Sequence, residues 1–186
     1  MNKPHKSLCF ALLLILVFTV CTYPANALTT EDSFSEDLQN YLFTVAWVTD
    51  TQYLSKFYPD VLQQMVAWLN SETQKGKVHH VVLTGDLVDD WNNVTQWRTF
   101  TSYWGSLTVE NDVLAGNHDN YGGANWTYYN SYFPNRQYYY KLKNGWLFIF
   151  LSYATVRNNV VQAWLRDLVK THTEKVVVLT HAYMNE

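Results

Sequence analysis

The sequence predicts an α/β domain organised around a mostly parallel sheet. From Phe43 onward, short apolar runs rich in β-branched and aromatic residues alternate with amphipathic stretches of helical period. Strands and helices that alternate in this order form βαβ units, whose crossover connections make neighbouring strands parallel. The chain has 186 residues, which is enough for one domain with its own core.

Each expected strand and helix follows from its own residue pattern. The first helix opens with Pro59 and Asp60, carries apolar residues at a spacing of three and four, and ends before Gly76. Asn144-Gly145 stands between two β-rich runs and predicts a hairpin with a two-residue turn. In chain order, we expect strands at 43–49, 78–84, 112–115, 137–143, 146–152 and 175–180, and helices at 59–75, 94–107 and 158–171.

Residues 1–27 are predicted to be a signal peptide. Lys3 and Lys6 precede an apolar run, 8–20, and Ala25-Asn26-Ala27 offers the small residues that a signal peptidase needs. The apolar run is about 13 residues long, short of the roughly 20 that span a bilayer, so a permanent anchor is the weaker alternative. Lipid attachment at Cys21 is a second alternative. We therefore expect a secreted, periplasmic or cell-surface protein.

Removal of residues 1–27 leaves a lead-in at 28–42 and a domain at 43–186. Both cysteines are lost, so disulfides cannot stabilise this exported domain. Without Lys3 and Lys6, 11 basic residues remain against 16 acidic ones, a net charge of −5. We expect no nucleic-acid surface and no transmembrane segment in the mature chain, and the sequence leaves the oligomeric state open.

Polar side chains follow four of the predicted strands. The carboxyl ends of parallel strands lie along one edge of a sheet, so these side chains are expected to meet there. Carboxylates, amides and imidazoles that converge in this way repel one another unless a cation joins them. The residues are Asp50 and Gln52, then Asp86, then Asn117 and His118, and finally His181.

Four blocks of sequence, VTDTQY, TGDLVDD, AGNHD and LTHAY, resemble those of the calcineurin-like metallophosphoesterases in order and spacing. The resemblance covers residues 43–186, and the DTQ variant of the first block is similar to a microbial, secreted branch of that superfamily. It implies a four-layer α/β/β/α sandwich with mixed sheets. The implied activity is hydrolysis of a small phosphomonoester or phosphodiester.

The resemblance also implies a set of metal ligands. Asp50 would bind a first ion and Asp86 would bridge two ions, while Asn117 and His181 would bind the second. Gln52 stands where the family has a histidine, and its amide oxygen is the weaker ligand. The ions would be divalent or trivalent, with Mn, Fe and Zn all suitable, and would hold a bridging hydroxide in line with phosphorus.

The family pattern further implies that His118 faces the leaving group and donates a proton to it, with Asp89 as the carboxylate that keeps this imidazole cationic. The family's last block, GHxH, does not occur after His181. We therefore expect a C-terminally incomplete domain, whose activity as a 186-residue chain is doubtful.

Several alternatives remain open from the sequence. Gln52 could face solvent and leave its coordination position to water, and His181 could simply bond to backbone at a strand end. The whole domain could be a non-catalytic exported binding module that retains the fold. The aromatic residues between 126 and 140 could line the active site or, as is commoner, pack a helix and hairpin onto the sheet. Of His79 and His80, alternation places one in the core and one outside.

Overall fold

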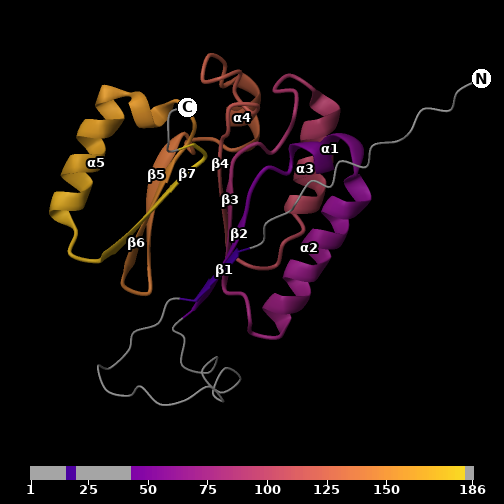
Figure 1. Ribbon diagram of the computed structural model, residues 1–186, viewed down its shortest axis with the longest axis horizontal. Helices are drawn as coiled ribbons and strands as arrows, with labels where there is room; N and C mark the ends of the chain where they lie inside the picture. The colour runs from indigo at the N-terminus through magenta and orange to yellow at the C-terminus, as the bar shows by residue number, and fades with distance from the viewer. Residues whose placement is uncertain (1–15, 20–42, 183–186) are drawn as a thin grey trace, which may run out of the picture.

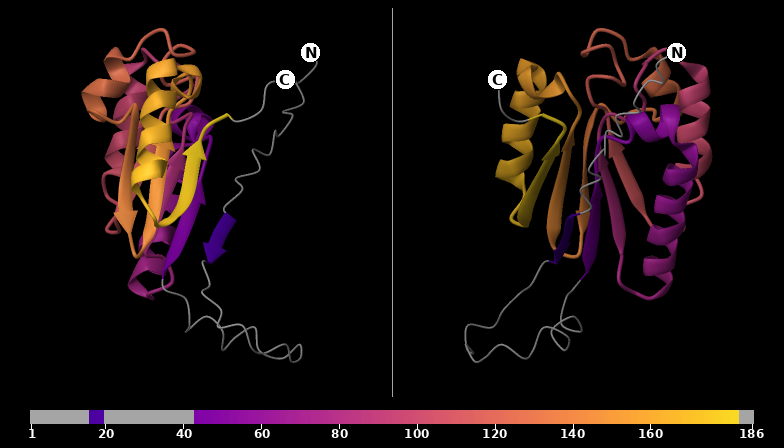
Figure 2. Two further views of the ribbon diagram at one scale, coloured as in Figure 1. Left: turned by 90° about the vertical axis from the view of Figure 1, so that its left-hand side faces the viewer. Right: turned by 45° about the vertical axis from the view of Figure 1, so that its right-hand side comes forward.

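The computed structural model describes residues 43–182 and the backbone of residues 16–19. Figures 1 and 2 show four layers, with α5 outside one sheet, a second sheet behind it, and α1, α2 and α3 on the far side. The strands are β1 Leu16–Thr19, β2 Thr44–Val48, β3 His80–Thr84, β4 Asn111–Leu114, β5 Tyr138–Lys143, β6 Trp146–Leu151 and β7 Lys175–Thr180. The helices are α1 Gln52–Phe57, α2 Pro59–Gln74, α3 Val94–Trp104, α4 Thr127–Tyr132, the 3-10 helix η2 Thr155–Arg157 and α5 Asn159–Thr171.

Both sheets are mixed. In the first, the order is β1-β2-β3-β4; β2, β3 and β4 run parallel, and β1 pairs antiparallel with β2. In the second, the order is β5-β6-β7, with an antiparallel hairpin and a parallel β6–β7 pair. Asn144 and Gly145 have φ of +51° and +77°, as the expected two-residue hairpin turn requires. The predicted α/β/β/α sandwich with mixed sheets is therefore confirmed.

Alternation along the strands divides the apolar residues among three cores, one between each pair of layers. The helix-side core lies between the first sheet and α1–α3 and includes Ala46, Val48, Leu62, Leu69, Val81, Leu83, Trp97 and Phe100. The inter-sheet core contains Phe43, Val45, Val82, Leu114, Phe148 and Phe150. The outer core, beneath α5, contains Leu147, Ile149, Leu151, Val161 and Leu168.

The parallel register brings the strand ends to one edge of the first sheet, which we call the carboxyl edge. Val48 of β2 lies opposite Leu83 of β3, and Thr84 lies opposite Leu114 of β4. This edge lies towards the top of Figure 1, where β7 also ends. The histidine pair behaves as alternation predicts, because His80 is buried and His79 is exposed.

Four elements differ from the sequence prediction, and the three-residue 3-10 helix η2 is one of them. Helices α1 and α4 were not expected, since each has only six residues and too few turns to show a helical period. Strand β1 lies within the segment predicted to be a signal peptide. The predicted cleavage after Ala27 and the lead-in 28–42 lie outside the described residues. None of the helices in the described part of the chain is long and apolar enough to cross a membrane.

Candidate metal centre

Two aspartates occupy the turns that leave β2 and β3. Asp50 and Asp86 have φ of +54° and +53°, a left-handed conformation that aspartate tolerates better than most residues. The N–H of Asp50 donates to the Gly85 carbonyl at 3.1 Å, so one strand-end turn is hydrogen-bonded to the other. The backbone thus stores strain at the two carboxylates that the sequence assigns to metal binding.

Asp50, Asp86 and His181 converge at the carboxyl edge. Each offers one ligand atom, and these three atoms lie within 4.8 Å of one another. Asp50 is exposed, whereas Asp86 is only 4% exposed. Burial raises the pKa of Asp86, and this rise is opposed by His181 and by the backbone N–H of His118. The prediction that residues 131 positions apart in the sequence meet at one edge agrees with this geometry.

The hydrogen bonds of His181 fix its ring so that Nε2 faces two oxygen atoms. Its Nδ1 lies 2.9 Å from the Thr84 carbonyl oxygen, so Nδ1 must carry the proton and donate. In the neutral ring, Nε2 is then an acceptor, yet it lies 3.0 Å from Asn117 Oδ1 and 3.5 Å from Asp86 Oδ1. A cation bound at this point would pair with Nε2 and with both oxygens. A backbone carbonyl that fixes the ring in this way is typical of a metal-ligating histidine.

Gln52 is the first residue of α1 and is buried, with 7% of its surface exposed. This burial argues against the solvent-facing alternative. Its Oε1 finds no hydrogen-bond partner among the described residues. A buried amide oxygen that lacks a donor is costly unless a cation or an ordered water pairs with it. Its chemistry therefore fits a metal ligand, although coordination by Gln52 stays a prediction.

Two glycines allow the β3 and β4 turns to approach each other closely. A Cβ atom on Gly116 would lie 2.1 Å from Asp86 Oδ1 and 2.4 Å from the Asp86 nitrogen. A Cβ atom on Gly85, whose φ is +95°, would lie 2.7 Å from His181 Nδ1. Only glycine fits at either position, so the glycines of TGD and AGN shape the metal centre although they bring no ligand.

Asp119 was not assigned a role from the sequence, and it is fully buried beneath the site. Its Oδ1 accepts from the N–H groups of Leu87 and Val88 at 2.8 and 3.0 Å, and its Oδ2 accepts from that of Gly116 at 2.8 Å. Burial and the Asp86 carboxylate raise the pKa of Asp119, against the pull of these three donors. Asp119 thereby joins the β3 turn to the β4 turn.

The ring of His118 is fixed through Nδ1, whose nearest partner is a backbone carbonyl rather than a carboxylate. Nδ1 lies 2.8 Å from the Asp89 carbonyl oxygen and 3.5 Å from the Asp89 carboxylate. The other carboxylate oxygen of Asp89 pairs with Lys56, which also reaches Asp90 at 3.1 Å. The carboxylate partner predicted for His118 is thus close but shared with a lysine that the sequence analysis missed. Lys56 stands one helical turn after Gln52 on α1, and only that spacing hints at it.

The aromatic cluster between residues 126 and 140 mostly packs. Tyr129 is fully buried, and Tyr140 is 43% exposed on the outer sheet. The packing alternative therefore describes this cluster. Trp126, Tyr128, Tyr129, Tyr132 and Phe133 lie on the helix-side core, Tyr138 on the outer core and Tyr139 on the inter-sheet core.

Other polar groups lie away from the carboxyl edge. His172 packs 5.4 Å from the ring of Tyr140, so it is no substitute for a missing ligand. His80, Glu110 and Asp112 also converge within 4.8 Å, but the ammonium groups of Lys141 and Lys143 already pair with their carboxylates at 2.7 to 3.1 Å.

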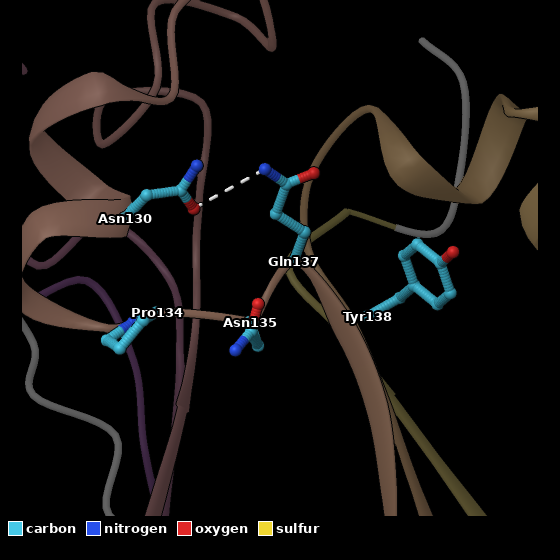
Figure 3. A pocket seen from close by; sticks show the side chains of 5 residues that line it. All are labelled: Asn130, Pro134, Asn135, Gln137 and Tyr138. Atoms are coloured by element: carbon cyan, nitrogen blue, oxygen red, sulfur yellow. Dashed lines mark hydrogen bonds between the residues drawn. The ribbon is translucent and has the colours of Figure 1, made fainter.

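A cavity of about 490 Å³ between α4 and the start of β5 has none of the candidate ligands in its lining. Figure 3 shows its side chains, with Asn130 and Gln137 joined across it at 3.4 Å. They are amides, a proline and a tyrosine rather than carboxylates or imidazoles. This cavity therefore lacks the groups that the chemistry of the carboxyl edge would need.

The fold and the strand-end site define a member of the calcineurin-like phosphoesterase family. The model of that family matches residues 43–186, so the chain belongs to it. The chain is also 25% identical to the uncharacterized protein YvnB of Bacillus subtilis (strain 168) over 167 residues, which cover 77% of this chain and 13% of the relative.

Among solved structures, a purple acid phosphatase, PPD1 from yellow lupin (Lupinus luteus) seeds, superposes with a TM-score of 0.58 at 13% identity. The match covers 74% of this chain and 32% of that one, and it supports the fold alone. The chain thus spans about an eighth and a third of the lengths of these two proteins.

Proposed function

We propose that this protein hydrolyses phosphate esters at a centre of two metal ions. The observation that carries the proposal is the convergence of Asp50, Asp86 and His181, whose ligand atoms lie within 4.8 Å of one another, with Asn117 Oδ1 at 3.0 Å from His181 Nε2. Asp50, Gln52 and Asp86 would hold the first ion. Asp86, Asn117 and His181 would hold the second. When bound, such ions would lower the pKa of the attacking water and neutralise charge on the phosphoryl oxygens.

The protein's own residues then provide proton transfer and positioning. Because Nδ1 of His118 donates to the Asp89 carbonyl, Nε2 is the ring atom free to give a proton to the departing ester oxygen. As water adds to phosphorus and the P–O bond breaks, this proton converts the alkoxide into a neutral alcohol. The Asp89 carboxylate lies 3.5 Å from Nδ1 of His118 and also pairs with Lys56, so it helps to orient the ring from a fixed position.

Leaving-group dependence tests this role. In the full-length protein, His118→Ala is expected to slow turnover of an alkyl phosphate roughly 10²- to 10⁴-fold, the range for loss of a general acid. The loss should shrink on p-nitrophenyl phosphate, whose leaving group needs little protonation. Asp89→Asn should show the same pattern more mildly. Steady-state kinetics on both esters and elemental analysis of each variant are the measurements.

Metal content separates the outcomes. If His118 were a ligand, its removal would deplete the metal and slow both esters equally, which would falsify the assignment. A full-length protein that binds metal but hydrolyses no phosphate ester would instead indicate the non-catalytic binding module. We further propose that the protein acts outside the cytoplasm, on the strength of the signal-peptide pattern in residues 1–27.

A further inference from the structure

A cavity of about 350 Å³ opens beside His118, on the side where a departing alcohol would lie. Its walls come from the segment after β3 and the segment after β4, which also carry His118 and the residues predicted to bind the metals. Binding sites for small organic molecules begin at about this size. Besides His118 and Asn117, the cavity is lined by Asp89, Asp90, Trp91, Asn92, Tyr121 and Gly122.

Two aromatic rings face each other in this cavity. The centroids of Trp91 and Tyr121 are 5.6 Å apart and their planes are tilted by 35°. Tyr128 meets Trp91 edge-on at 6.0 Å from the other side and so braces the indole. Tyr121 is 64% exposed, so its ring is accessible to a ligand. The pair therefore offers aromatic surface to a ligand beside the proposed general acid.

The backbone beneath both rings is fixed. Trp97 donates from its indole nitrogen to the Trp91 carbonyl at 2.7 Å. Tyr121 has φ of +53°, and its carbonyl accepts from Ala124 at 3.1 Å while the next residue, Gly122, donates to the Asn117 carbonyl at 2.8 Å. A backbone held in this way keeps the two residues in place, so little main-chain freedom is lost on binding, which favours affinity.

Negative charge at the rim of this cavity limits the kinds of ligand that it can bind. Hydrogen bonds from Lys56 and from Gln96 lower the pKa of Asp90, so its carboxylate is ionised at neutral pH. Asp89 stands beside it, and Lys56 neutralises only one of these two charges. An anionic leaving group would be repelled here, whereas N–H donors on a neutral ring would find acceptors.

We propose that the alcohol released by this enzyme carries a planar, uncharged heteroaromatic ring, as a nucleoside does, and that Trp91 and Tyr121 bind this ring. The inference rests on the proposed phosphoesterase function. It makes Trp91 and Tyr121 specificity-determining residues on the leaving-group side, with the phosphoryl group at the metal centre.

The test compares two phosphate esters at the primary hydroxyl of ribose, one with a heteroaromatic base on the sugar and one without. In the full-length, metal-loaded protein, kcat/KM for adenosine 5′-monophosphate should exceed that for ribose 5-phosphate. Trp91→Ala and Tyr121→Ala should each lower this ratio roughly 5- to 100-fold, the range for loss of one aromatic partner from a stacked base. Tyr140→Ala, which removes a comparably exposed ring on the outer sheet, should leave the ratio unchanged.

A binding measurement keeps the inference apart from the proposed function. Calorimetry should show that adenosine binds the unmodified protein and the Tyr140→Ala variant, and that binding weakens in Trp91→Ala and Tyr121→Ala. If no ester is hydrolysed but this pattern of binding holds, the function fails and the ring site stands. Equal kcat/KM for the two esters, or adenosine binding that neither variant changes, would overturn the ring site while phosphoesterase activity stands.

Discussion

Asp119 shows how a buried side chain can support a site without touching its ligand. One of its oxygens serves two N–H donors of the β3 turn, and the other serves one donor of the β4 turn. Asp119→Asn must place an NH₂ group against at least one of these donors. We expect a loss of stability of about 1–3 kcal/mol, typical of a buried donor left unpaired, together with weaker metal binding.

Thermal unfolding and metal titration of Asp119→Asn are the measurements. Asp167→Asn is the control, because Asp167 is an exposed residue of α5. A variant that unfolds more easily yet binds metal with unchanged affinity would show that Asp119 stabilises the fold without positioning the centre.

The candidate ligands could be predicted from the sequence where a polar residue directly follows a predicted strand. Asp50, Asp86 and His181 follow predicted strands and do converge. Trp91 and Tyr121 were not predicted, because a sequence does not reveal which exposed ring lines a cavity. Both also lie outside the segment that is richest in aromatic residues. The burial of Gln52 was equally out of reach, since it depends on α1, a helix too short to predict.

The turns that follow β3 and β4 approach each other closely, so a substitution there can change the geometry of the site without changing its charge. In Gly116→Ala, the new methyl group would overlap Asp86 and force the two turns apart. We expect metal content to fall and the protein to be destabilised. Gly76→Ala is the control, since a Cβ atom there meets nothing within 4 Å and only its φ of +70° disfavours alanine.

Elemental analysis and thermal unfolding distinguish these two alanine variants. Gly76→Ala is destabilised by its backbone conformation and Gly116→Ala by its contact with Asp86, but only Gly116→Ala should lose metal. Full metal occupancy in Gly116→Ala would mean that the centre tolerates a wider separation of the turns than the structure indicates.

The long elements were predictable because their periodicity extends over several turns or a complete strand. Helix α5 begins one residue after its expected start, where the Asn158 side chain accepts from the N–H groups of Val160 and Val161. Strand β1 was not predictable, since an apolar run near two lysines favours a signal peptide. Pairing between β1 and β2 depends on a partner that the run itself does not specify.

The two sheets are joined by ions as well as by apolar contacts, which gives the fold a pH dependence. Lys143 of β5 donates to Glu110 at 2.7 Å. This hydrogen bond is the main reason why the pKa of Glu110 falls from 4.5 to about 2. Burial raises the pKa of Asp112, but His80 Nε2 at 3.1 Å and the Lys141 ammonium at 2.9 Å outweigh it and leave that pKa lowered. Carboxylates with depressed pKa values stabilise the fold above their unfolded pKa and lose this contribution as the pH falls.

Lys143→Met should therefore lower the midpoint of thermal unfolding at neutral pH, and the difference from the unmodified protein should shrink between about pH 4.5 and 2. The effect will be modest, because Glu110 is 48% exposed. Lys170→Met, on exposed α5, should not show this convergence. A difference in unfolding midpoint that stays constant from neutral pH to about pH 2 would show that Glu110 does not contribute to this pH dependence.

The arrangement of layers was predictable from the family resemblance, whereas periodicity alone led only to an α/β class. Alternation predicted which face of each strand is apolar. It did not predict that the opposed faces of β3 and β6 meet through Val82 and Phe148 in the inter-sheet core. Such contacts depend on how two sheets pack, which no local pattern encodes.

The candidate ligands lie on four separate strand ends, and the last of them, His181, arrives only when β7 has paired with β6. An unfolded chain therefore has no metal site, and affinity appears with the native topology. If the chain crosses a membrane unfolded, as its proposed export implies, it must acquire its ions after translocation. The identity of the metal would then be chosen by the supply where the protein folds, not by the supply where it is translated.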